Sequence, residues 1–512
     1  MLLHEVIEFA ASRDPDGVAL VVSERSWTFA ELWRDISRMA AVLAGMAGAG
    51  ERIAVVSDNR AEVLLIQYAA PMASVVAMFG NTRLTPAELV DLIEDVGPSL
   101  LIGSEEQLTR LADVVGAVGS IRRCVAFEAL DLGRPPEDVG SVLADREPRP
   151  EDTAWIIHTS GTTGRAKGAL LTHRSVLAAV LNTALCRPTA PDDVYLFPFP
   201  LFHVAAYNVI HLHLRGRPVV LVAKFDAVDV MTQIERHRVT SISLAPTMIA
   251  MLLDHPERAA HDLGSLRHVF YGASAIPIDV LRRGLAELGC EFGQGYGMTE
   301  LSGNAVFLDA AAHRRAVGPD PHLLAAAGRV GPLAAVRLVD DDLRDVEPGE
   351  SGEIVIRGDQ VVAGYWNRPG ASAHARTADG WFRTGDVGRF DAEGFLYVVD
   401  RRKDIIVTGG ENVASREVED VLVGHPLVRQ VAVVGAPHPQ WGEQVVAVVV
   451  THDPALDPSE IAAEIGAWSR GRIAGFKRPR HVLITDALPL NASGKVLKAE
   501  LRALVVERLS RR

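Results

Sequence analysis

HTSGTTGRAKGALLTH, residues 158–173, places small hydroxyl side chains, glycines and one lysine directly after an apolar segment. Glycines let backbone N–H groups approach an anion closely, hydroxyls donate further hydrogen bonds, and Lys167 adds a mobile positive charge. This composition favours a polyphosphate ligand. A polar hairpin turn is the alternative, because Gly and Thr clusters between apolar runs are common in loops.

The same stretch does not fit a Walker A loop, which needs G-x-x-x-x-G-K-[ST]. Counting from Gly161, Ala166 stands where the second glycine should be, and Lys167 is followed by Gly168 rather than by Ser or Thr. A kinase or P-loop ATPase is therefore disfavoured, while nucleotide binding stays open.

The segments before this loop alternate between helical and strand periodicity over residues 28–103. Two of the expected helices begin at capping boxes, Thr28 with Glu31 and Thr85 with Glu88. Such alternation predicts parallel strands joined by crossover helices. The strand AWIIHTS then places the loop at a strand end, where open α/β sheets bind ligands.

The later segments predict further subdomains. Residues 194–297 repeat the α/β pattern, and residues 329–400 show short strands between Gly and Asp turns. At 512 residues the chain exceeds the usual size of one core, so two or more domains are expected. The predicted fold is α/β. A large amino-terminal domain of α/β subdomains with a β-rich subdomain, residues 1–400, precedes a small mobile α+β domain, residues 401–512.

Composition limits the partners of the protein. Lys and Arg total 52 against 65 Asp and Glu, and the net charge of -13 argues against nucleic acid or an anionic membrane. The three cysteines show neither zinc-ligand spacing nor a disulfide framework, which fits the reducing cytoplasm. We expect no secretory signal, and no apolar stretch reaches the ~20 residues of a membrane span. A homodimer is left open.

Five motifs occur in a fixed order along the chain: HTSGTTGRAKG from residue 158, YGMTE at 296–300, WFRTGD at 381–386, DRRKDIIVTGGENV at 400–413 and NASGK at 491–495. Together they resemble the acyl-adenylate-forming superfamily, in its acyl-CoA synthetase branch. The resemblance spans nearly the whole chain. It implies a ligase that acts on a small carboxylic acid with ATP, Mg²⁺ and coenzyme A.

The resemblance assigns a nucleotide site. Tyr296 is expected to pack on adenine, Thr299 to approach the α-phosphate, and Glu300 to help bind Mg²⁺, which prefers one or two carboxylates together with phosphates. Taken singly, these motifs also fit a helix start, a tight turn or a solvated basic face. The resemblance implies that Asp386 accepts the ribose hydroxyls and that Arg401 meets the ribose from the other side. The full set of expected ATP-binding residues is Thr159, Ser160, Gly161, Thr162, Thr163, Gly164, Lys167, Gly272, Ala273, Ser274, Gly295, Tyr296, Gly297, Asp386 and Arg401.

The small domain is expected to serve both half-reactions. Lys495 of NASGK resembles the lysine that bridges the attacking carboxylate and the α-phosphate, offsetting charge as two anions approach. Lys403 resembles a hinge about which this domain turns before thioester formation. A hairpin turn and ordinary surface packing are the alternatives for the expected CoA contacts, which are Gly409, Gly410, Trp441, Phe476 and Arg478.

The segment PLFHVAAYN, residues 200–208, is expected to border the acid. His203 resembles a gate or catalytic residue, with a satisfied core histidine as the alternative. No Asp or Glu occurs over residues 197–214 to pair with an α-ammonium, and Gly295 stands where malonate-type relatives carry arginine. An uncharged hydrophobic acid, of the medium- or long-chain fatty type, is predicted, and an aryl acid is the alternative. The expected acyl pocket comprises His203, Val204, Tyr207, Asn208 and Gly303.

Two positions depart from the family pattern: Ala166 replaces the usual proline, and Ala414–Ser415 replaces a common Tyr-Pro. Three classes remain open: an acid:CoA ligase, a ligase that loads a separate carrier protein, and a nucleotide-binding protein without turnover. We expect no appended carrier domain after KAELRALVVERLSRR, an expectation that favours free CoA. Four residues argue together against loss of turnover: Lys167, Glu300, Asp386 and Lys495.

Overall fold

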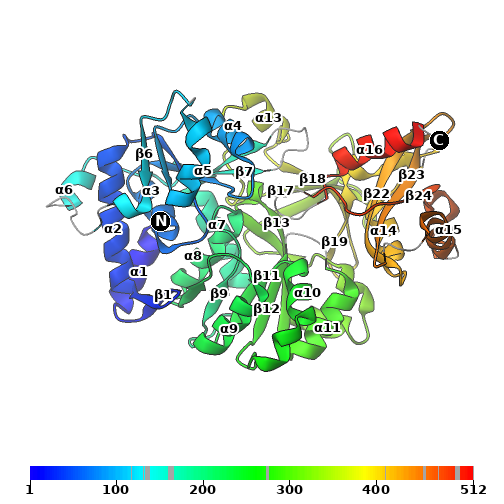
Figure 1. Ribbon diagram of the computed structural model, residues 1–512, viewed down its shortest axis with the longest axis horizontal. Helices are drawn as coiled ribbons and strands as arrows, with labels where there is room; N and C mark the ends of the chain where they lie inside the picture. Colours follow the sequence, from blue (N-terminus) through cyan, green and yellow to red (C-terminus); the bar gives the residue numbers. More distant parts are fainter. Residues whose placement is uncertain are drawn as a thin grey trace. The chain divides into compact units, whose positions relative to one another are not determined.

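The protein has a mixed α/β fold, as predicted, in a computed structural model (Figure 1). The structure describes residues 1–116, 118–130, 132, 139–159, 166–272, 276–409, 411–453, 457–470, 472–490 and 496–510. The chain divides into two compact units, Met1–Val336 with Ile356–Phe382, and Arg337–Val355 with Arg383–Arg512. The predicted boundary after residue 400 falls inside the second unit and stays a prediction.

The first sheet of the first unit is six-stranded. Strands β6, β5, β3, β4 and β7 run parallel in that order, and β8 closes the sheet antiparallel to β7. Helices α2 (Phe29–Met46) and α4 (Pro86–Val96) begin at the two predicted capping boxes, both of which are confirmed. The remaining elements are α3 (Ala61–Met72), α5 (Glu105–Val115), α6 (Val139–Leu143), β3 (Arg52–Val56), β4 (Val76–Gly80), β5 (Leu100–Gly103), β6 (Arg123–Ala126), β7 (Thr153–Thr159) and β8 (Lys167–Thr172).

The second sheet of this unit is nine-stranded, in the order β15-β14-β13-β12-β11-β9-β10-β1-β2. Helices α9, α10 and α11 lie together beside β11 and β12 in Figure 1. Its strands are β1 (Val18–Val22), β2 (Arg25–Thr28), β9 (Tyr195–Phe197), β10 (Val219–Leu221), β11 (Ser241–Leu244), β12 (His268–Gly272), β13 (Glu291–Met298), β14 (Gly303–Leu308) and β15 (Arg329–Val330). Its helices are α1 (Glu5–Arg13), α7 (His173–Cys186), α8 (Tyr207–Leu214), α9 (Ala227–His237), α10 (Pro246–Asp254), α11 (Ile278–Leu288) and α12 (Ala310–Ala316).

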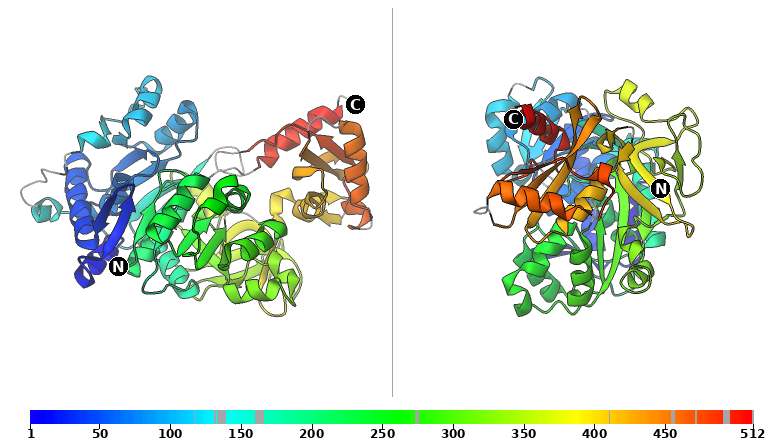
Figure 2. Two further views of the ribbon diagram at one scale, coloured as in Figure 1. Left: turned by 60° about the horizontal axis from the view of Figure 1, so that its bottom comes forward. Right: turned by 90° about the vertical axis from the view of Figure 1, so that its right-hand side faces the viewer.

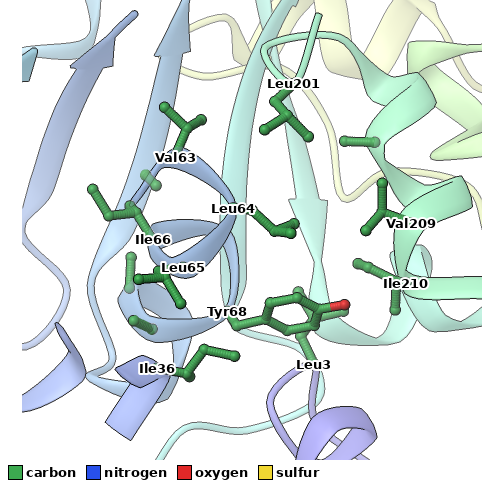
Figure 3. Close-up of a cluster of buried hydrophobic side chains, with 14 of the residues drawn as sticks. Leu3, Ile36, Val63, Leu64, Leu65, Ile66, Tyr68, Leu201, Val209 and Ile210 are labelled. Carbon is green, nitrogen blue, oxygen red and sulfur yellow. The ribbon is translucent and has the colours of Figure 1, made fainter. Parts of the chain in front are cut away.

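An apolar core joins the helices between these two sheets. Val209 and Ile210 of α8 pack with Leu64 and Tyr68 of α3 in one buried cluster, which Figure 3 shows. Burying such side chains contributes about 1.5–3 kcal/mol each. The start of α8, which carries the expected acyl-pocket residues, is therefore held by a packed core.

The second unit is built on a five-stranded sheet and most of a four-stranded one. Helices α14 and α15 pack on one face of the five-stranded sheet and α16 on the other, an arrangement visible in Figure 2. The elements are β16 (Ala335–Val339), β17 (Gly352–Arg357), β18 (Phe382–Phe390), β19 (Leu396–Arg401), β20 (Ile406–Thr408), β21 (Glu411–Val413), α14 (Ser415–Val423), β22 (Val428–His438), β23 (Gly442–Thr451), α15 (Pro458–Trp468), β24 (His481–Ile484) and α16 (Lys498–Ser510).

Among the described residues, no helix combines the length and the apolar character that crossing a bilayer requires.

Candidate active site

The hydroxyl-rich loop is the connection of a β-hairpin. Strands β7 and β8 pair antiparallel up to Thr159 and Lys167, whose Cα atoms are partners across the ladder. The two ends of the loop therefore meet, with Lys167 at the point where the chain returns to the sheet. The expected phosphate contacts Ser160, Gly161, Thr162, Thr163 and Gly164 lie outside the described residues.

A later segment of the same unit runs along β8. The backbone N–H of Leu170 donates to the Gly364 carbonyl at 2.9 Å, and Ala169 forms an antiparallel bridge with Tyr365. This register brings Tyr365 beside Lys167, whose ammonium lies 5.1 Å from the centroid of the tyrosine ring. The contact is a cation–π interaction.

Tyr365 also contacts the carboxylate of the YGMTE motif. Its hydroxyl donates to Glu300 Oε1 at 3.0 Å. Burial, and next the Glu300 charge, raise the pKa of Tyr365, so the phenol stays a donor at neutral pH. One side chain thus connects Lys167 and Glu300, the two residues expected at the phosphates and at Mg²⁺.

The segment around Glu300 is fixed by buried amides and hydroxyls. Thr299–Leu301 forms one 3₁₀ turn directly after β13. Fully buried Gln360 donates from Nε2 to the carbonyls of Leu301 and Asn304, at 3.1 and 3.2 Å. These bonds hold the turn that presents Thr299 and Glu300.

The donor set at Glu300 fits Mg²⁺ bound together with phosphate. The second carboxylate oxygen of Glu300 has no protein partner in the part of the chain that the structure describes. The same described residues contain no group of three His, Cys, Asp or Glu able to hold a metal. One carboxylate with phosphates and water is a common Mg²⁺ environment, whereas a cage made only of protein ligands is not.

The expected glycines at the ends of β12 and β13 are required by close packing. A Cβ on Gly272 would lie 2.7 Å from the Gly295 carbonyl oxygen, and one on Gly297 would lie 2.0 Å from that of Gly303. These positions leave a flat backbone surface at the strand ends. Tyr296 is half-buried between the two β13 glycines, while Ala273 and Ser274 lie outside the described residues.

Two residues of the expected acyl pocket are in direct contact. A Cβ on Gly303 would lie 2.9 Å from the ring of Tyr207, so the glycine backbone lies directly on the buried tyrosine. Asn208, next on α8, accepts a hydrogen bond from Arg187 Nη1 at 2.6 Å.

His203 and Val204 stand at the start of the 3₁₀ turn before α8. Burial, assisted by Arg83, lowers the pKa of His203 to about 4, so the ring is neutral at pH 7. A neutral imidazole can act as a gate or a hydrogen-bonding group beside apolar substrate, and it adds no charge to the pocket.

The expected ribose contacts are cross-strand neighbours within the second unit. Asp386 of β18 is the Cα partner of Arg401 on β19, and Arg401 Nε lies 2.7 Å from Asp386 Oδ1. Asp386 is only 3% exposed, so Arg401 supplies a positive charge to a buried carboxylate. A ribose bound here would meet the two residues as an ion pair.

The expected hinge residue lies in the 3₁₀ turn Arg402–Asp404. Arg502 of α16 donates to the Lys403 carbonyl at 3.0 Å and to Asp404 Oδ1 at 2.6 Å. Burial lowers the pKa of Lys403. The expected catalytic Lys495, in the loop before α16, lies outside the described residues.

Two of the expected CoA contacts touch each other. Gly409 has a φ of +62°, its N–H donates to the Trp441 carbonyl at 2.8 Å, and a Cβ there would lie 2.8 Å from Trp441 Cε3. Phe476 is 42% exposed, and Arg478 donates to the Ile473 carbonyl at 3.3 Å. Gly410 lies outside the described residues.

The sequence did not single out Tyr365, Gln360 or Arg187. Tyr365 lies in GYWNRP, just before the WFRTGD motif, and only the register of its segment on β8 brings it to the site. Gln360 and Arg187 are buried polar side chains, which neither periodicity nor motif spacing distinguishes from surface ones. Composition gives no signal for any of the three.

Comparison with known proteins identifies the class. The AMP-binding enzyme family matches residues 7–366, and the AMP-binding enzyme C-terminal domain matches residues 417–495. A feruloyl-CoA synthase from an Amycolatopsis species is 38% identical over 96% of both chains. A long-chain-fatty-acid–CoA ligase from Mycobacterium tuberculosis is 35% identical, over 93% of this chain and 92% of that protein.

A solved structure is similar over the same length. O-succinylbenzoate coenzyme A synthetase from Bacillus subtilis, in complex with ATP and a magnesium ion, superposes with a TM-score of 0.84. It is 31% identical, over 97% of this chain and 98% of that one. The chain therefore belongs to the AMP-binding enzyme family. The predicted class, an AMP-forming acyl-CoA synthetase that uses ATP, Mg²⁺ and CoA, is confirmed.

Proposed function

We propose that this enzyme activates a hydrophobic carboxylic acid, of the medium- or long-chain fatty type, and transfers it to CoA. The observation that most supports ATP binding is the chain of contacts from Lys167 through Tyr365 to Glu300. Binding of a hydrophobic acid is supported by the apolar residues of α8 and by His203, whose ring is neutral at pH 7. The similarity to a long-chain-fatty-acid–CoA ligase supports the same substrate class.

The residues divide the work of two half-reactions. In the first, Lys167 and the hairpin loop bind the phosphates, and Lys495 offsets charge as the carboxylate attacks the α-phosphorus and pyrophosphate leaves. Mg²⁺ at Glu300 would supply further positive charge to the phosphates. In the second, the small domain turns at Lys403 and the CoA sulfur attacks the acyl carbon, releasing AMP.

An aryl acid is the second candidate. A feruloyl-CoA synthase is 38% identical to this chain, and three phenylalanines, Phe270, Phe292 and Phe307, line a cavity next to α7. Flat aromatic acids pack well against such rings. A separate carrier protein as thiol acceptor, a homodimer and a cytoplasmic location remain predictions from the sequence.

The deciding experiment is a pyrophosphate-release screen over fatty acids of increasing length and over aryl acids, run with and without CoA. Fatty acids are expected to give the highest kcat/KM, and CoA to convert the adenylate into a thioester. Pyrophosphate release with aryl acids but not with fatty acids would show that the enzyme is an aryl-acid CoA ligase. Thioester formed only on a carrier protein would exclude CoA as acceptor.

Two variants test the division of labour. Lys495→Ala should abolish acid-dependent pyrophosphate release yet still form thioester from supplied acyl-adenylate. Lys403→Pro should do the reverse. Equal loss of both steps in Lys495→Ala would exclude its assigned role, and an unchanged overall rate in Lys403→Pro would exclude the hinge.

A further inference from the structure

Arg187, the C-cap residue directly after α7, is a buried cation. It is 7% exposed. Its Nη1 donates to Asn208 Oδ1 at 2.6 Å, its Nη2 donates to Ser243 Oγ at 3.4 Å, and its guanidinium lies 3.5 Å from the centroid of the Phe270 ring. Every one of these partners is electrically neutral.

No carboxylate balances this charge. In the described ranges of the chain, Arg187 forms no ion pair, and its Nε–H, although buried, has no hydrogen-bond partner. Buried charges in proteins are normally paired, because removal from water is unfavourable without an opposite charge. A buried cation with an unpaired donor and no counter-charge is what we expect of a subsite that binds an anion or a ligand oxygen.

The neighbouring histidine supports the same picture. Both ring nitrogens of buried His211 on α8 lack partners among the described residues. Burial, and next the Arg187 charge, lower the pKa of His211 well below its usual range. The ring is therefore neutral and supplies no second cation beside Arg187.

Arg187 stands over the sheet face that leads to the expected acyl and adenine sites. Ser243, Phe270 and Gly293 are paired positions on β11, β12 and β13, so their side chains share one face. Gly272 and Gly295 occupy the next pair on that face, two residues or about 7 Å nearer the carboxyl ends of the strands. Asn208, which Arg187 holds, is the neighbour of Tyr207 in the expected acyl pocket.

The space beside Arg187 is a mixed cavity, which His268 and Asp309 line together with three phenylalanine rings. A cavity of about 160 Å³ is lined by Arg187 together with Phe270, Phe307 and the flat backbone of Gly293. Such a cavity offers apolar walls for a carbon skeleton and one strong donor at its boundary.

We propose that Arg187 recognises an oxygen at the far end of the acyl substrate, so that the enzyme selects acids carrying a second oxygen function remote from the reacting carboxylate. The inference rests on the proposed acid:CoA ligase activity, and it replaces the fully uncharged acyl chain of the proposed substrate by one that carries a remote oxygen. The guanidinium of Arg187 lines the cavity, and a planar group with five N–H donors suits a carboxylate or a phenolic oxygen. Malonate-type relatives carry such an arginine at the position of Gly295, whereas in this chain Arg187 follows α7.

Matched pairs of acids test the proposal. Octanedioic acid is compared with octanoic acid, and 4-hydroxycinnamic acid with cinnamic acid, by kcat/KM for pyrophosphate release. The first pair reports an anionic oxygen and the second a neutral one. For at least one pair, the wild-type enzyme should prefer the oxygenated acid by about tenfold or more, because a site built to hydrogen-bond an oxygen rejects the analogue that lacks it.

Arg187→Met should remove that preference while unsubstituted acids are still activated, and Arg187→Lys, which keeps charge but loses the fork, should reduce it. Arg146→Met is the control, since Arg146 is a half-buried arginine whose hydrogen bonds among the described residues go to the backbone carbonyls of Ala44 and Ala47. The control should keep the wild-type preference.

A wild-type enzyme without preference in either pair overturns the inference, even if Arg187→Met fails to fold. So does a preference that survives in Arg187→Met or Arg187→Lys unchanged. Absence of pyrophosphate release with every acid would instead refute the proposed function itself, and the inference with it.

Discussion

Removal of one hydroxyl, in Tyr365→Phe, is the most direct test of the nucleotide site. Phenylalanine keeps the ring that lies 5.1 Å from the Lys167 ammonium, and with it the cation–π contact and the packing. It loses only the donor 3.0 Å from Glu300 Oε1. The variant therefore isolates the positioning of the Glu300 carboxylate.

The expected magnitude follows from the type of bond. A hydrogen bond to a charged acceptor contributes about 1.5–3 kcal/mol, and each ~1.36 kcal/mol corresponds to a factor of ten. We expect kcat/KM for MgATP in acid-dependent pyrophosphate release to fall by about 10- to 100-fold. The transfer of supplied acyl-adenylate to CoA should be much less affected.

A double-mutant cycle makes this test decisive. If the hydroxyl acts through Glu300, Tyr365→Phe combined with Glu300→Gln should be no slower than Glu300→Gln alone. Losses that multiply, or a Tyr365→Phe enzyme with wild-type MgATP kinetics, would refute the reasoning. Thermal unfolding of each variant checks that the protein remains folded.

Three further outcomes are expected. Gly409→Ala adds a Cβ to a residue with a φ of +62°, which costs about 1–2 kcal/mol of strain, and places it 2.8 Å from Trp441 Cε3. This variant should slow thioester formation but not pyrophosphate release. Equal slowing of both steps would contradict a role of Gly409 in CoA binding. Ser415→Pro fits the first turn of α14 but removes two donors to Asp400. At about 1.5–3 kcal/mol for each bond, it should lower the free energy of unfolding in urea by about 3–6 kcal/mol. Burial lowers the pKa of His213 from 6.5 to about 4, so its neutral form is favoured in the folded state and stability present above pH 6.5 is lost as pH falls toward 4. This group contributes up to about 3 kcal/mol, and His213→Gln should show a shallower loss of stability in urea titrations between pH 7 and 4.5.

Local chemistry made much of the fold predictable. The capping boxes at Thr28 and Thr85 marked helix starts because their bonds involve residues only three apart. The strand that leads into the hydroxyl-rich loop was predicted for a similar reason, since its apolar run is continuous. These signals depend only on residues that are close in the chain, and they can therefore be recognised in the sequence alone.

Long-range register was not predictable in the same way. Tyr365 reaches Lys167 only because its segment forms a bridge with Ala169, nearly two hundred residues earlier. Asp386 and Arg401 were both expected at a ribose, and that stays a prediction; the ion pair that antiparallel pairing of β18 and β19 gives them was not predicted. Which side chains meet across a sheet depends on pairing that no local pattern encodes.

The bonds between Asp400 and Ser415 bear on the proposed turn at Lys403, because one residue precedes Lys403 and the other follows it. Asp400 Oδ2 accepts from the backbone N–H and the hydroxyl of Ser415, at 2.6 and 2.7 Å, in a buried setting. A large backbone rotation at Lys403 would separate the two residues and leave the carboxylate without both donors. Each of these bonds contributes about 1.5–3 kcal/mol. Breaking both therefore costs a free energy comparable to that needed to shift a two-state equilibrium from mostly one state to mostly the other. A proline at position 415 has no N–H and could not form the backbone bond. The departure of Ala414–Ser415 from Tyr-Pro therefore bears on how readily the small domain turns, and it gives no reason to prefer a carrier protein over CoA.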